Sequence, residues 1–388
     1  MPIINRVAAL SDEIAAWRQD FHTHPELDYD VHRTAGIVAE KLKEFGCDEV
    51  VTGVGRTGVV GVIKGRLPGD KVIAMRADMD ALPIQEETGK PYASQTPGKM
   101  HACGHDGHTS MLLGAARYLA ETRNFAGTAV VIFQPAEEGG GGGRAMVEDG
   151  VMDRFGVTEV YGMHNMPGLP VGAFALRPGP LMAAADRFTL EIAGRGAHAA
   201  HPHASIDTVM VATQIITAFQ TIVSRNVDPL EAAVVSVTYV RAGDAFNVLP
   251  QSATLKGTVR TLNPKVQDLV EARMHEIATG VAALHGAVAT LQYDRGYPCT
   301  VNHEAQTAFA ADVAAQVVGD DRVNAAVQPT MGAEDFSYML LARPGAFIFT
   351  GNGDTAGLHN PGYDFDDKAI PVGVSYWARL VETAMPAA

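Results

Sequence analysis

The segment at residues 101–108 holds the densest group of metal-binding side chains in the sequence. It reads His101-Ala102-Cys103-Gly104-His105-Asp106-Gly107-His108 and opens a helical pattern. Thiolate and imidazole groups are strong ligands for zinc-like divalent ions. The spacing of two residues between Cys103 and His105 can bring both side chains to one site on a loop. The alternative is a buried cysteine beside helix-capping polar residues, and the density of ligands favours a metal site.

The segment at residues 134–139 is a second candidate. It reads Gln134-Pro135-Ala136-Glu137-Glu138-Gly139 and directly follows an apolar strand at Val130–Phe133. Open α/β sheets bind ligands outside the carboxyl ends of their strands. Because adjacent side chains there point in different directions, one glutamate could bind a metal while the other acts on bound water as a general base. A solvated acidic turn is a common alternative, and this motif alone does not decide between the two.

Two further histidines lie at the ends of predicted elements. His164 follows a strand at 159–163, and His359 follows a glycine-rich loop. A lone histidine is more often structural than a metal ligand. Together with Cys103, His105 and Glu138, however, these residues make five candidate ligands. Five are too few for two separate closed sites but enough for two metal ions that share one bridging ligand.

Asp78 and Asp80 lie just after a predicted strand at 72–75. Carboxylates at such a strand end can orient a metal-bound histidine through its second ring nitrogen. A helix-capping turn before Ala81-Leu82-Pro83 is an equally good interpretation of the same residues.

Alternating helices and strands must position these side chains. In the first part of the chain, apolar residues at helical spacing predict helices, and short β-rich runs bounded by Gly and Pro predict strands. Their order indicates an α/β sandwich with a mostly parallel sheet. The predicted helices cover residues 4–21, 34–45 and 108–122, and the predicted strands cover residues 50–51, 59–63, 72–75, 128–133 and 159–163.

The pattern changes near residue 184 and returns after Pro298. The middle part has the order βαββαβ, which resembles a small two-layer, ferredoxin-like α+β unit with an antiparallel four-stranded sheet. We therefore predict a catalytic domain at residues 1–184 and 299–388 that is interrupted by an inserted domain at residues 185–298. The predicted elements of the insert are strand 187–192, helix 206–224, strands 232–240 and 253–260, helix 264–285 and strand 287–293, and those after it are helix 304–318, a short element at 336–341, strand 346–350 and a helix from about 368.

Two glycine motifs are interpreted as local structure. Gly53-x-Gly55-x-x-Gly58 has the spelling of a dinucleotide fingerprint, but a strand follows it instead of the required helix, so we expect a hairpin turn. The run Gly139–Gly143 is expected to be a flexible loop that lets the backbone approach the site. The sequence has no Gly-x-Ser-x-Gly elbow and no phosphate-binding Lys-Ser/Thr loop, so serine hydrolases and nucleotide hydrolases lack their motifs.

Composition and charge exclude several classes of partner. The 388 residues are 47% hydrophobic, and 44 acidic residues against 30 basic ones give a net charge of −14. This charge argues against nucleic acids and anionic membranes as partners, because both require a basic surface. No apolar run is long enough to span a bilayer. Three widely spaced cysteines and the lack of a signal-peptide pattern lead us to expect a reducing, cytoplasmic setting.

Seven segments together resemble the aminoacylase/carboxypeptidase family of di-metal amidohydrolases. The branch in question includes hippurate hydrolases, N-acyl-L-amino-acid amidohydrolases and auxin-conjugate hydrolases. The resemblance covers nearly the whole chain and implies an α/β catalytic domain that is phosphorylase/hydrolase-like and of zinc-peptidase type, with an inserted lid or dimerisation domain. The segments are Phe21–Leu27, Arg76–Pro83, His101–His108, Gln134–Gly139, His164–Pro167, Gly332–Phe336 and His359–Pro361.

The resemblance implies which residues hold the metals. Asp78 departs from the family pattern, because other branches have a histidine ligand at that place. The resemblance implies that the segment around Cys103 provides the metal ligand instead. Asp80 would keep the orienting role, with a partner that the sequence does not identify. The residues that match metal ligands are Cys103, His105, Glu138, His164 and His359, with Cys103 as the bridging ligand.

The resemblance also implies catalytic and substrate-binding residues. Glu137 matches the catalytic base. His198 matches a histidine that reaches a partner subunit's site and stabilises the developing oxyanion. Asn247 and Arg260 match substrate-binding positions, and Arg260 could bind an α-carboxylate through two hydrogen bonds.

We therefore expect an enzyme that hydrolyses the amide bond of N-acyl-L-amino acids, such as N-acetyl or N-benzoyl amino acids. Two divalent ions per subunit, of Zn, Mn, Co or Ni, would serve as cofactors. A homodimer or homotetramer through the inserted domain is expected. The alternatives are a dipeptidase or carboxypeptidase, an N-acetyl-diaminopimelate deacetylase, and a non-catalytic metal-binding protein. The filled base position at Glu137 argues against the last.

Overall fold

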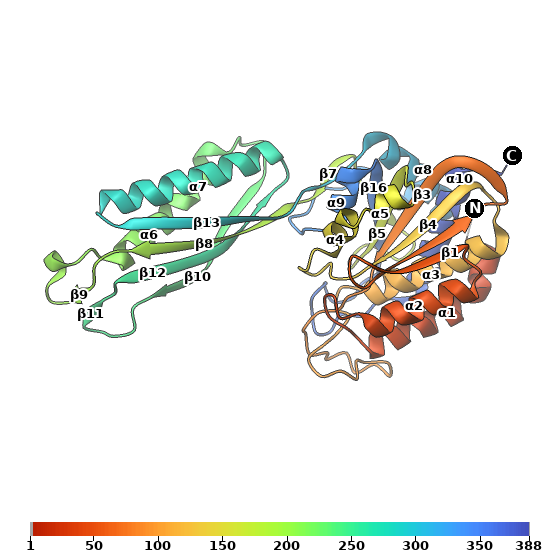
Figure 1. The fold of residues 1–388 in the computed structure, drawn as a ribbon, viewed down its shortest axis with the longest axis horizontal. Helices are drawn as coiled ribbons and strands as arrows, with labels where there is room; N and C mark the ends of the chain where they lie inside the picture. The colour runs from red at the N-terminus through yellow and green to blue at the C-terminus, as the bar shows by residue number, and fades with distance from the viewer. Residues whose placement is uncertain (1–2, 388) are drawn as a thin grey trace. The chain divides into compact units, whose positions relative to one another are not determined.

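The computed structural model describes residues 3–387 and contains two compact units. The first unit comprises the residues up to Leu181, Val301–Gln328 and those from Asp335 onward. The second unit comprises Met182–Thr300 and Pro329–Glu334. Each unit has its own hydrophobic core, and Figure 1 labels their elements. Among the described residues, no helix is both long and apolar enough to cross a membrane.

An eight-stranded sheet forms the centre of the first unit (Figure 1). Its strand order is β1-β2-β4-β3-β5-β16-β6-β15. The four middle strands β4, β3, β5 and β16 run parallel to one another, which confirms the predicted α/β class with a mostly parallel sheet. The strands are β1 (Glu49–Val54), β2 (Gly58–Lys64), β3 (Leu67–Asp78), β4 (Ala126–Gln134), β5 (Glu159–Met166), β6 (Phe174–Ala175), β15 (Val323–Asn324) and β16 (Gly345–Gly351).

The middle strands are apolar along most of their length because helices or loops cover both faces of the sheet. All seven residues of β16 are buried, as are the last six of β4. β1 and β2 form an antiparallel hairpin. Gly53, at a bulge of β1, and Gly55, in the turn, have φ of 83° and 58°, a region that favours glycine. The glycine motif is therefore a hairpin turn, as predicted.

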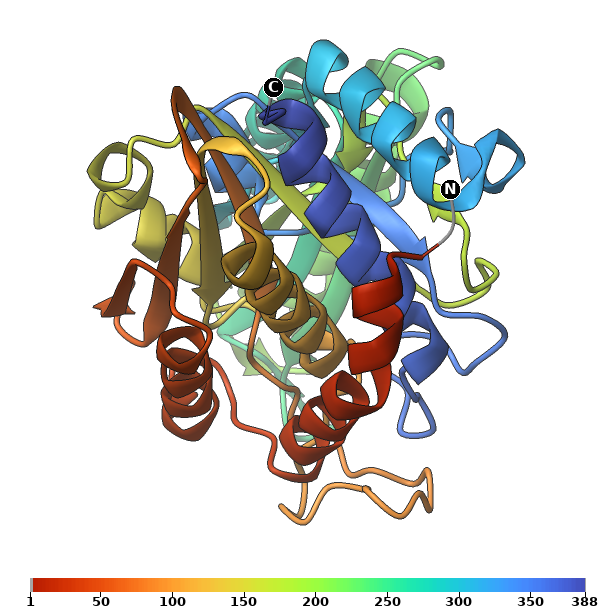
Figure 2. The same cartoon turned by 90° about the vertical axis from the view of Figure 1, so that its right-hand side faces the viewer.

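Helices α1, α3 and α10 pack against one another over the sheet, and they appear red, ochre and dark blue in Figure 2. A close approach of α1 and α3 explains Gly114, whose Cβ would lie 2.6 Å from Ile14 Cδ1. The helices of this unit are α1 (Asn5–Thr23), α2 (His32–Glu44), α3 (His105–Thr122), α4 (Gly142–Glu148), α5 (Val151–Arg154), α8 (Glu304–Val318), α9 (Ser337–Ala342) and α10 (Ile370–Ala384).

The glycine run differs from the flexible loop expected at Gly139–Gly143. Gly142 and Gly143 are buried and begin α4. A Cβ on Gly142 would lie 1.7 Å from the carbonyl oxygen of Pro135. Glycine is therefore required here by close packing rather than by mobility.

The second unit is a four-stranded antiparallel sheet with two helices. The strand order is β10-β12-β8-β13, and α6 and α7 pack against this sheet (Figure 1). This arrangement confirms the ferredoxin-like βαββαβ architecture. The helix expected at 206–224 ends at Thr221 and continues as a π-helical turn at Ile222–Asn226. The elements are β8 (Ala184–Ala193), α6 (Thr208–Thr221), β10 (Ala233–Ala242), β12 (Ser252–Thr261), α7 (Pro264–Leu284) and β13 (Val288–Tyr297).

Two small ladders complete the strands. β9 (Ala197–His198) pairs with β11 (Val248–Leu249) inside the second unit. β7 (Gly179–Met182) pairs with β14 (Thr300–Asn302).

Candidate metal centre and active site

The carboxyl ends of neighbouring parallel strands gather the site residues in the first unit. Asp78 ends β3 and lies in register with Gln134 at the end of β4. His164 lies near the end of β5. Because these strands are parallel, the segments that follow them meet at one edge of the sheet. The loop before α3 brings Cys103 and His105 to the same edge, and His105 is the first residue of the helix.

The five residues predicted as metal ligands lie together at this edge. Cys103 Sγ is 3.4 Å from His164 Nε2. Glu138 Oε1 is 3.3 Å from His359 Nε2 and 3.9 Å from His105 Nε2. The candidate donor atoms form two groups whose members all lie within 4.8 Å of one another: Cys103 with His105 and His164, and Cys103 with Glu138 and His359. Cys103 belongs to both groups, as a bridging ligand would.

His359 differs from the other four. Its side chain is 53% exposed, and its backbone φ of 61° lies in the left-handed region that non-glycine residues rarely adopt. The other four side chains are buried or nearly so. The ligand set therefore has one member at the surface of the unit.

Buried donor atoms without partners indicate that a cation fits this site. Among the described residues, His105 Nε2 and Glu138 Oε1 are buried and form no hydrogen bond, although they lie 3.9 Å apart and Glu138 Oε1 lies 3.3 Å from His359 Nε2. Burial and the negative charge of Glu138 raise the pKa of the Cys103 thiol well above its usual range, so a thiolate here requires a cation. Burial and the neighbouring His108 hold the pKa of His164 well below its usual range, which leaves a neutral imidazole that can bind metal.

Asp80 fixes the turn that carries both glutamates. Its Oδ1 accepts the backbone N–H of Glu137 at 2.9 Å, and its Oδ2 accepts that of Glu138 at 3.1 Å. Its carbonyl oxygen lies 2.8 Å from His105 Nδ1, which leaves His105 Nε2 for a metal. Glu137 is itself buried, and a carboxylate oxygen of it lies within 4.8 Å of donor atoms of His105 and Glu138.

Asp78 holds a second set of contacts behind the ligands. Its Oδ2 accepts Arg76 Nη1–H at 2.7 Å, and its Oδ1 lies 2.7 Å from His108 Nδ1. Burial opposes the charge on Asp78, but His105, Arg76 and His108 hold the pKa of this carboxyl well below its usual range. Burial likewise opposes protonation of His105, yet Asp78 and Asp80 raise its pKa to about 10. A cation that binds at His105 must therefore displace a proton.

Asn165 connects three segments around the ligands. Its backbone N–H donates to His108 Nε2 at 2.9 Å, and its Nδ2 donates to the carbonyl oxygen of Cys103 at 2.6 Å. Tyr363 Oη donates to its Oδ1 at 2.8 Å. The fit is so close that a Cβ on Gly104 would lie 2.2 Å from Asn165 Nδ2. Asn165 thus ties the cysteine loop, β5 and the C-terminal loop together.

Asp335 fastens the turn after β4 from the other side. It accepts the backbone N–H of Gly143 at 2.7 Å, Gln134 Nε2–H at 2.7 Å and 2.9 Å, and Arg76 Nη2–H at 2.9 Å. Asp335, Gln134 and Arg76 are all buried. The turn with Glu137 is therefore held by carboxylates on both sides.

These supporting residues were not predicted from the sequence to belong to the site. Tyr363 had no sequence signal, because it lies outside every recognised motif. The others carried the signal of lying inside segments that match the family. They are Arg76, His108, Gln134, Asn165 and Asp335.

The three predicted residues of the second unit lie at two opposite ends of it. His198 is exposed in β9, and the backbone of Asn247 accepts the N–H of Ala199 at 2.9 Å, so His198 and Asn247 share one tip. Arg260 lies at the far end of β12, in register with Ala185. Its guanidinium is half-buried and donates to Val259 O and Thr258 Oγ1. No carboxylate among the described residues forms an ion pair with it.

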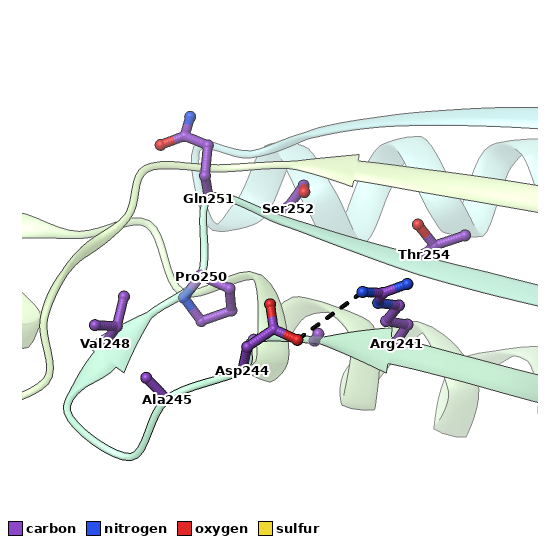
Figure 3. A pocket seen from close by; sticks show the side chains of 10 residues that line it. Arg241, Asp244, Ala245, Val248, Pro250, Gln251, Ser252 and Thr254 are labelled. Carbon is purple, nitrogen blue, oxygen red and sulfur yellow. Dashed lines mark ion pairs between the residues drawn. The ribbon is translucent and has the colours of Figure 1, made fainter.

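A groove of about 540 Å³ lies beside the loop that carries Asn247 (Figure 3). Arg241 and Asp244 form an ion pair at its side, with a distance of 3.9 Å. None of the residues predicted for metal binding, catalysis or substrate binding lines it. Its lining residues are Arg241–Ala245, Val248, Pro250–Ser252 and Thr254.

Comparison with known proteins gives matches over nearly the full chain. A model of "Peptidase family M20/M25/M40" matches residues 74–383. The chain is 42% identical over 380 residues to a hippurate hydrolase of Campylobacter jejuni, with 98% of each chain covered. It is 42% identical over 364 residues to an N-acetylcysteine deacetylase of Bacillus subtilis, with 94% of each covered. The solved structure of Bacillus subtilis YXEP, a dinuclear metal binding peptidase, has a TM-score of 0.86 and 36% identity, covering 98% of this chain and 100% of that chain.

The fold and the comparisons define a hydrolase that acts on amide bonds. More particularly, the chain belongs to peptidase family M20/M25/M40.

Proposed function

We propose that this protein hydrolyses the amide bond of N-acyl-L-amino acids and releases a carboxylate and a free amino acid. The observation that carries the proposal is the pair Glu137–Glu138, which Asp80 holds at the edge of a buried Cys, His and Glu ligand set. A hippurate hydrolase and an N-acetylcysteine deacetylase among the relatives support the substrate class.

Cys103, His105, Glu138, His164 and His359 would hold two divalent ions, with Cys103 between them. Cys103 is the one residue common to the group with His105 and His164 and the group with Glu138 and His359, which supports the bridging role. A thiolate with imidazoles favours zinc-like ions, and manganese, cobalt and nickel are the other candidates. When bound, the ions would activate water and polarise the amide carbonyl.

Glu137 would act as the general base and then as the general acid. Its position beside the ligand set allows it to take a proton from the attacking water. It would then return that proton to the amide nitrogen, because the amine leaves only when it is protonated. Asp80 fixes the backbone of Glu137, which limits how far the base can move during the reaction.

His198 would donate a hydrogen bond to the oxyanion, and Arg260 would bind the α-carboxylate of the substrate. Ala200 N–H donates to His198 Nδ1 at 3.1 Å, so the ring proton is on Nε2, where it can be donated. Arg260 is half-buried and lacks an acidic partner in the described chain, which supports an anionic ligand there. Asn247, beside His198, would contact the substrate amide.

The ends of the second unit support a site shared between subunits. β12 separates the His198 tip from Arg260 by eight residues, or roughly 26 Å at strand spacing. A single amino-acid derivative is too short to touch both in one chain. We therefore infer a homodimer, or a tetramer built from such dimers, in which one subunit supplies His198 and Asn247 and the other supplies Arg260.

A carboxypeptidase is the second candidate. The chain is 39% identical over 386 residues to thermostable carboxypeptidase 1 of Saccharolobus solfataricus. The same base and ligands would serve, with an aminoacyl group in place of the acyl group.

The test is amino-acid release from N-acetyl, N-benzoyl and indole-acyl amino acids and from dipeptides. The protein is stripped of metal and then supplied with zinc, manganese or cobalt. We expect metal-dependent release from at least one acyl amino acid. Release from dipeptides alone would move the assignment to a peptidase, and no release with any metal would overturn the proposal.

A further inference from the structure

Three exposed histidines lie on one turn of the second unit, and none of them belongs to the ligand set of the first unit. They are His198, His201 and His203 in the segment Gly196–Ser205. The turn is closed by the His201 N–H, which donates to the carbonyl oxygen of His198 at 2.8 Å, and a 3-10 helix follows at Pro202–Ala204. The ring centroids of His198 and His201 are 5.6 Å apart, and those of His201 and His203 are 6.0 Å apart.

We propose that these three histidines form a binding site for a zinc-class transition metal ion, and that an ion bound there blocks the catalytic use of His198. The blocking effect rests on the proposed function of His198, whereas the binding itself does not. The site would be inhibitory and would act only when the ion is in excess over the dinuclear site.

The ring spacing fits a common ion. Two imidazoles that bind one tetrahedral ion through nitrogens about 2.0–2.1 Å from it have ring centres about 5 Å apart. The two observed separations exceed this by up to about 1 Å, and the nitrogens of all three rings do not lie within 4.8 Å of one another, so binding requires rotation of these exposed side chains. Three histidines leave a fourth position open for water, which is the usual composition of an open zinc site.

The charges around the turn leave the three rings available. Among the described residues, no carboxylate forms an ion pair with any of the three rings. The nearby Asp207 is engaged at the start of α6, where it accepts the N–H groups of Val209 and Met210. Arg195 donates to the carbonyl oxygen of Ala204 at 2.9 Å. With an arginine at the turn and only imidazoles as ligands, the site would select Zn²⁺, Ni²⁺ or Cu²⁺ over Mg²⁺, which prefers oxygen ligands.

The Nε2 atom of His198 would be both the metal-binding atom and the hydrogen-bond donor to the oxyanion. The bond from Ala200 N–H occupies His198 Nδ1, so Nε2 is the atom left to bind an ion. The same Nε2 would donate its proton to the oxyanion during turnover. An ion at Nε2 requires the ring proton to move to Nδ1, which breaks the bond from Ala200 N–H, so a histidine that holds the ion has no Nε2 proton to donate.

The first test measures binding without turnover. The full chain, with its dinuclear site already filled, is titrated with Zn²⁺ against a chromophoric chelator. We expect one further Zn²⁺ ion to bind per chain. His201→Gln should weaken it by at least the ~10-fold typical of smaller changes around a metal. His275→Gln, which removes an exposed histidine of α7, is the matched control and should bind as the unaltered protein does. If no further equivalent binds, or if His201→Gln binds it equally well, the site does not exist.

The second test measures inhibition. Excess Zn²⁺ should inhibit the unaltered protein, and His201→Gln should keep its uninhibited rate but need ~10-fold or more Zn²⁺ for the same inhibition. Equal inhibition of both proteins, despite different binding, would overturn the blocking of His198. If neither protein turns over any substrate, the proposed function fails, and the binding titration still decides on the metal site.

Discussion

At the scale of single residues, the site depends on atoms behind the ligands as much as on the ligands. Asp80 accepts the backbone N–H groups of Glu137 and Glu138. It therefore positions both residues without using their carboxylates as hydrogen-bond partners. Burial raises the pKa of Asp80, and the adjacent His105 opposes this effect. One buried carboxylate thus connects the proposed base to the proposed metal ligands.

The first residue-scale prediction concerns the proposed base. Glu137→Gln keeps the size and polarity of the side chain but removes its ability to accept a proton. We expect kcat to fall by ~10²–10⁴, the usual contribution of general acid–base catalysis. Metal content should stay unchanged, as measured by elemental analysis of the purified variant. A variant with full activity would exclude Glu137 as the base.

The second residue-scale prediction concerns the space around Gly104. Its φ is 89°, and a Cβ there would meet Asn165 Nδ2 at 2.2 Å and Tyr363 Oη at 2.4 Å. Gly104→Ala should therefore lower the free energy of unfolding by about 2–4 kcal/mol, since left-handed backbone strain adds to overpacking. It should also weaken metal binding by displacing the cysteine loop.

Gly98→Ala is the matched control for this variant. Gly98 also has a positive φ, 73°, but open space surrounds its Cβ position, so only the backbone cost of about 1 kcal/mol applies. Urea unfolding and metal titration compare the two variants. Equal losses of stability and unchanged metal affinity would show that the contact with Asn165 does not matter.

Residue types indicated the candidate ligands but not the residues that support them. Cys103, His105 and Glu138 could be identified as candidates because thiol, imidazole and paired carboxylates are unusual in such density. Asn165 and Tyr363 have ordinary side chains, and their role depends on hydrogen bonds between segments 198 residues apart. Such long-range pairings are set by the packing of the whole sheet, which local patterns do not specify.

At the scale of elements, a buried polar cluster joins α1 to α3 and to the long loop between β3 and α3. His22 of α1 lies 2.8 Å from Asp106 of α3 and 3.3 Å from Glu86 of the loop. The neighbouring Glu87 donates its N–H to the carbonyl oxygen of Pro361, close to His359. The cluster thus anchors a loop that supports the exposed end of the ligand set.

The element-scale prediction follows from the protonation of His22. Burial opposes its charge, but Asp106 and Glu86 raise its pKa to about 9 from the ordinary 6.5. Protonated His22 therefore stabilises the fold fully below about pH 6.5, and this stabilisation is lost as pH rises through about 9. The amount lost is about 3 kcal/mol.

Comparison with His22→Gln isolates this effect. In metal-free protein, the difference in unfolding free energy between the two proteins should shrink by about that amount between pH 6 and pH 10. Urea unfolding at a series of pH values measures it. A difference that does not change with pH would mean that His22 is not charged in the folded protein.

The longer elements were largely predictable, whereas several short ones were missed, and α4 is the most informative of these. The apolar runs of β4 and β16 and the helical spacing of α1 identify them without knowledge of the fold. Helix α4 was missed because it begins with Gly142 and Gly143, which have poor helix propensity. Its start is set by Pro135 and Asp335, which are tertiary contacts that override the local preference.

At the scale of the whole molecule, catalysis is expected to need two subunits. We predict that His198→Ala and Glu137→Gln are each nearly inactive alone. After the two are unfolded together and reassembled, a mixed dimer would have one site with both changes and one with neither. Random pairing should restore about a quarter of the full activity in a symmetric dimer. Activity assays and size-exclusion chromatography follow the mixing, and an absence of recovery in confirmed mixed dimers would place His198 in its own subunit's site.

The position of β16 has a consequence for how the chain is made. This strand lies between β5 and β6 inside the sheet, yet its residues Gly345–Gly351 are synthesised after the entire stretch Met182–Thr300 of the second unit. The second unit can therefore fold on a growing chain while β5 still has an unpaired edge, which is a template for aggregation. His359 is also synthesised last, after the other four candidate ligands. A ribosome that stalls before residue 345 leaves a folded insert on an unfinished enzyme.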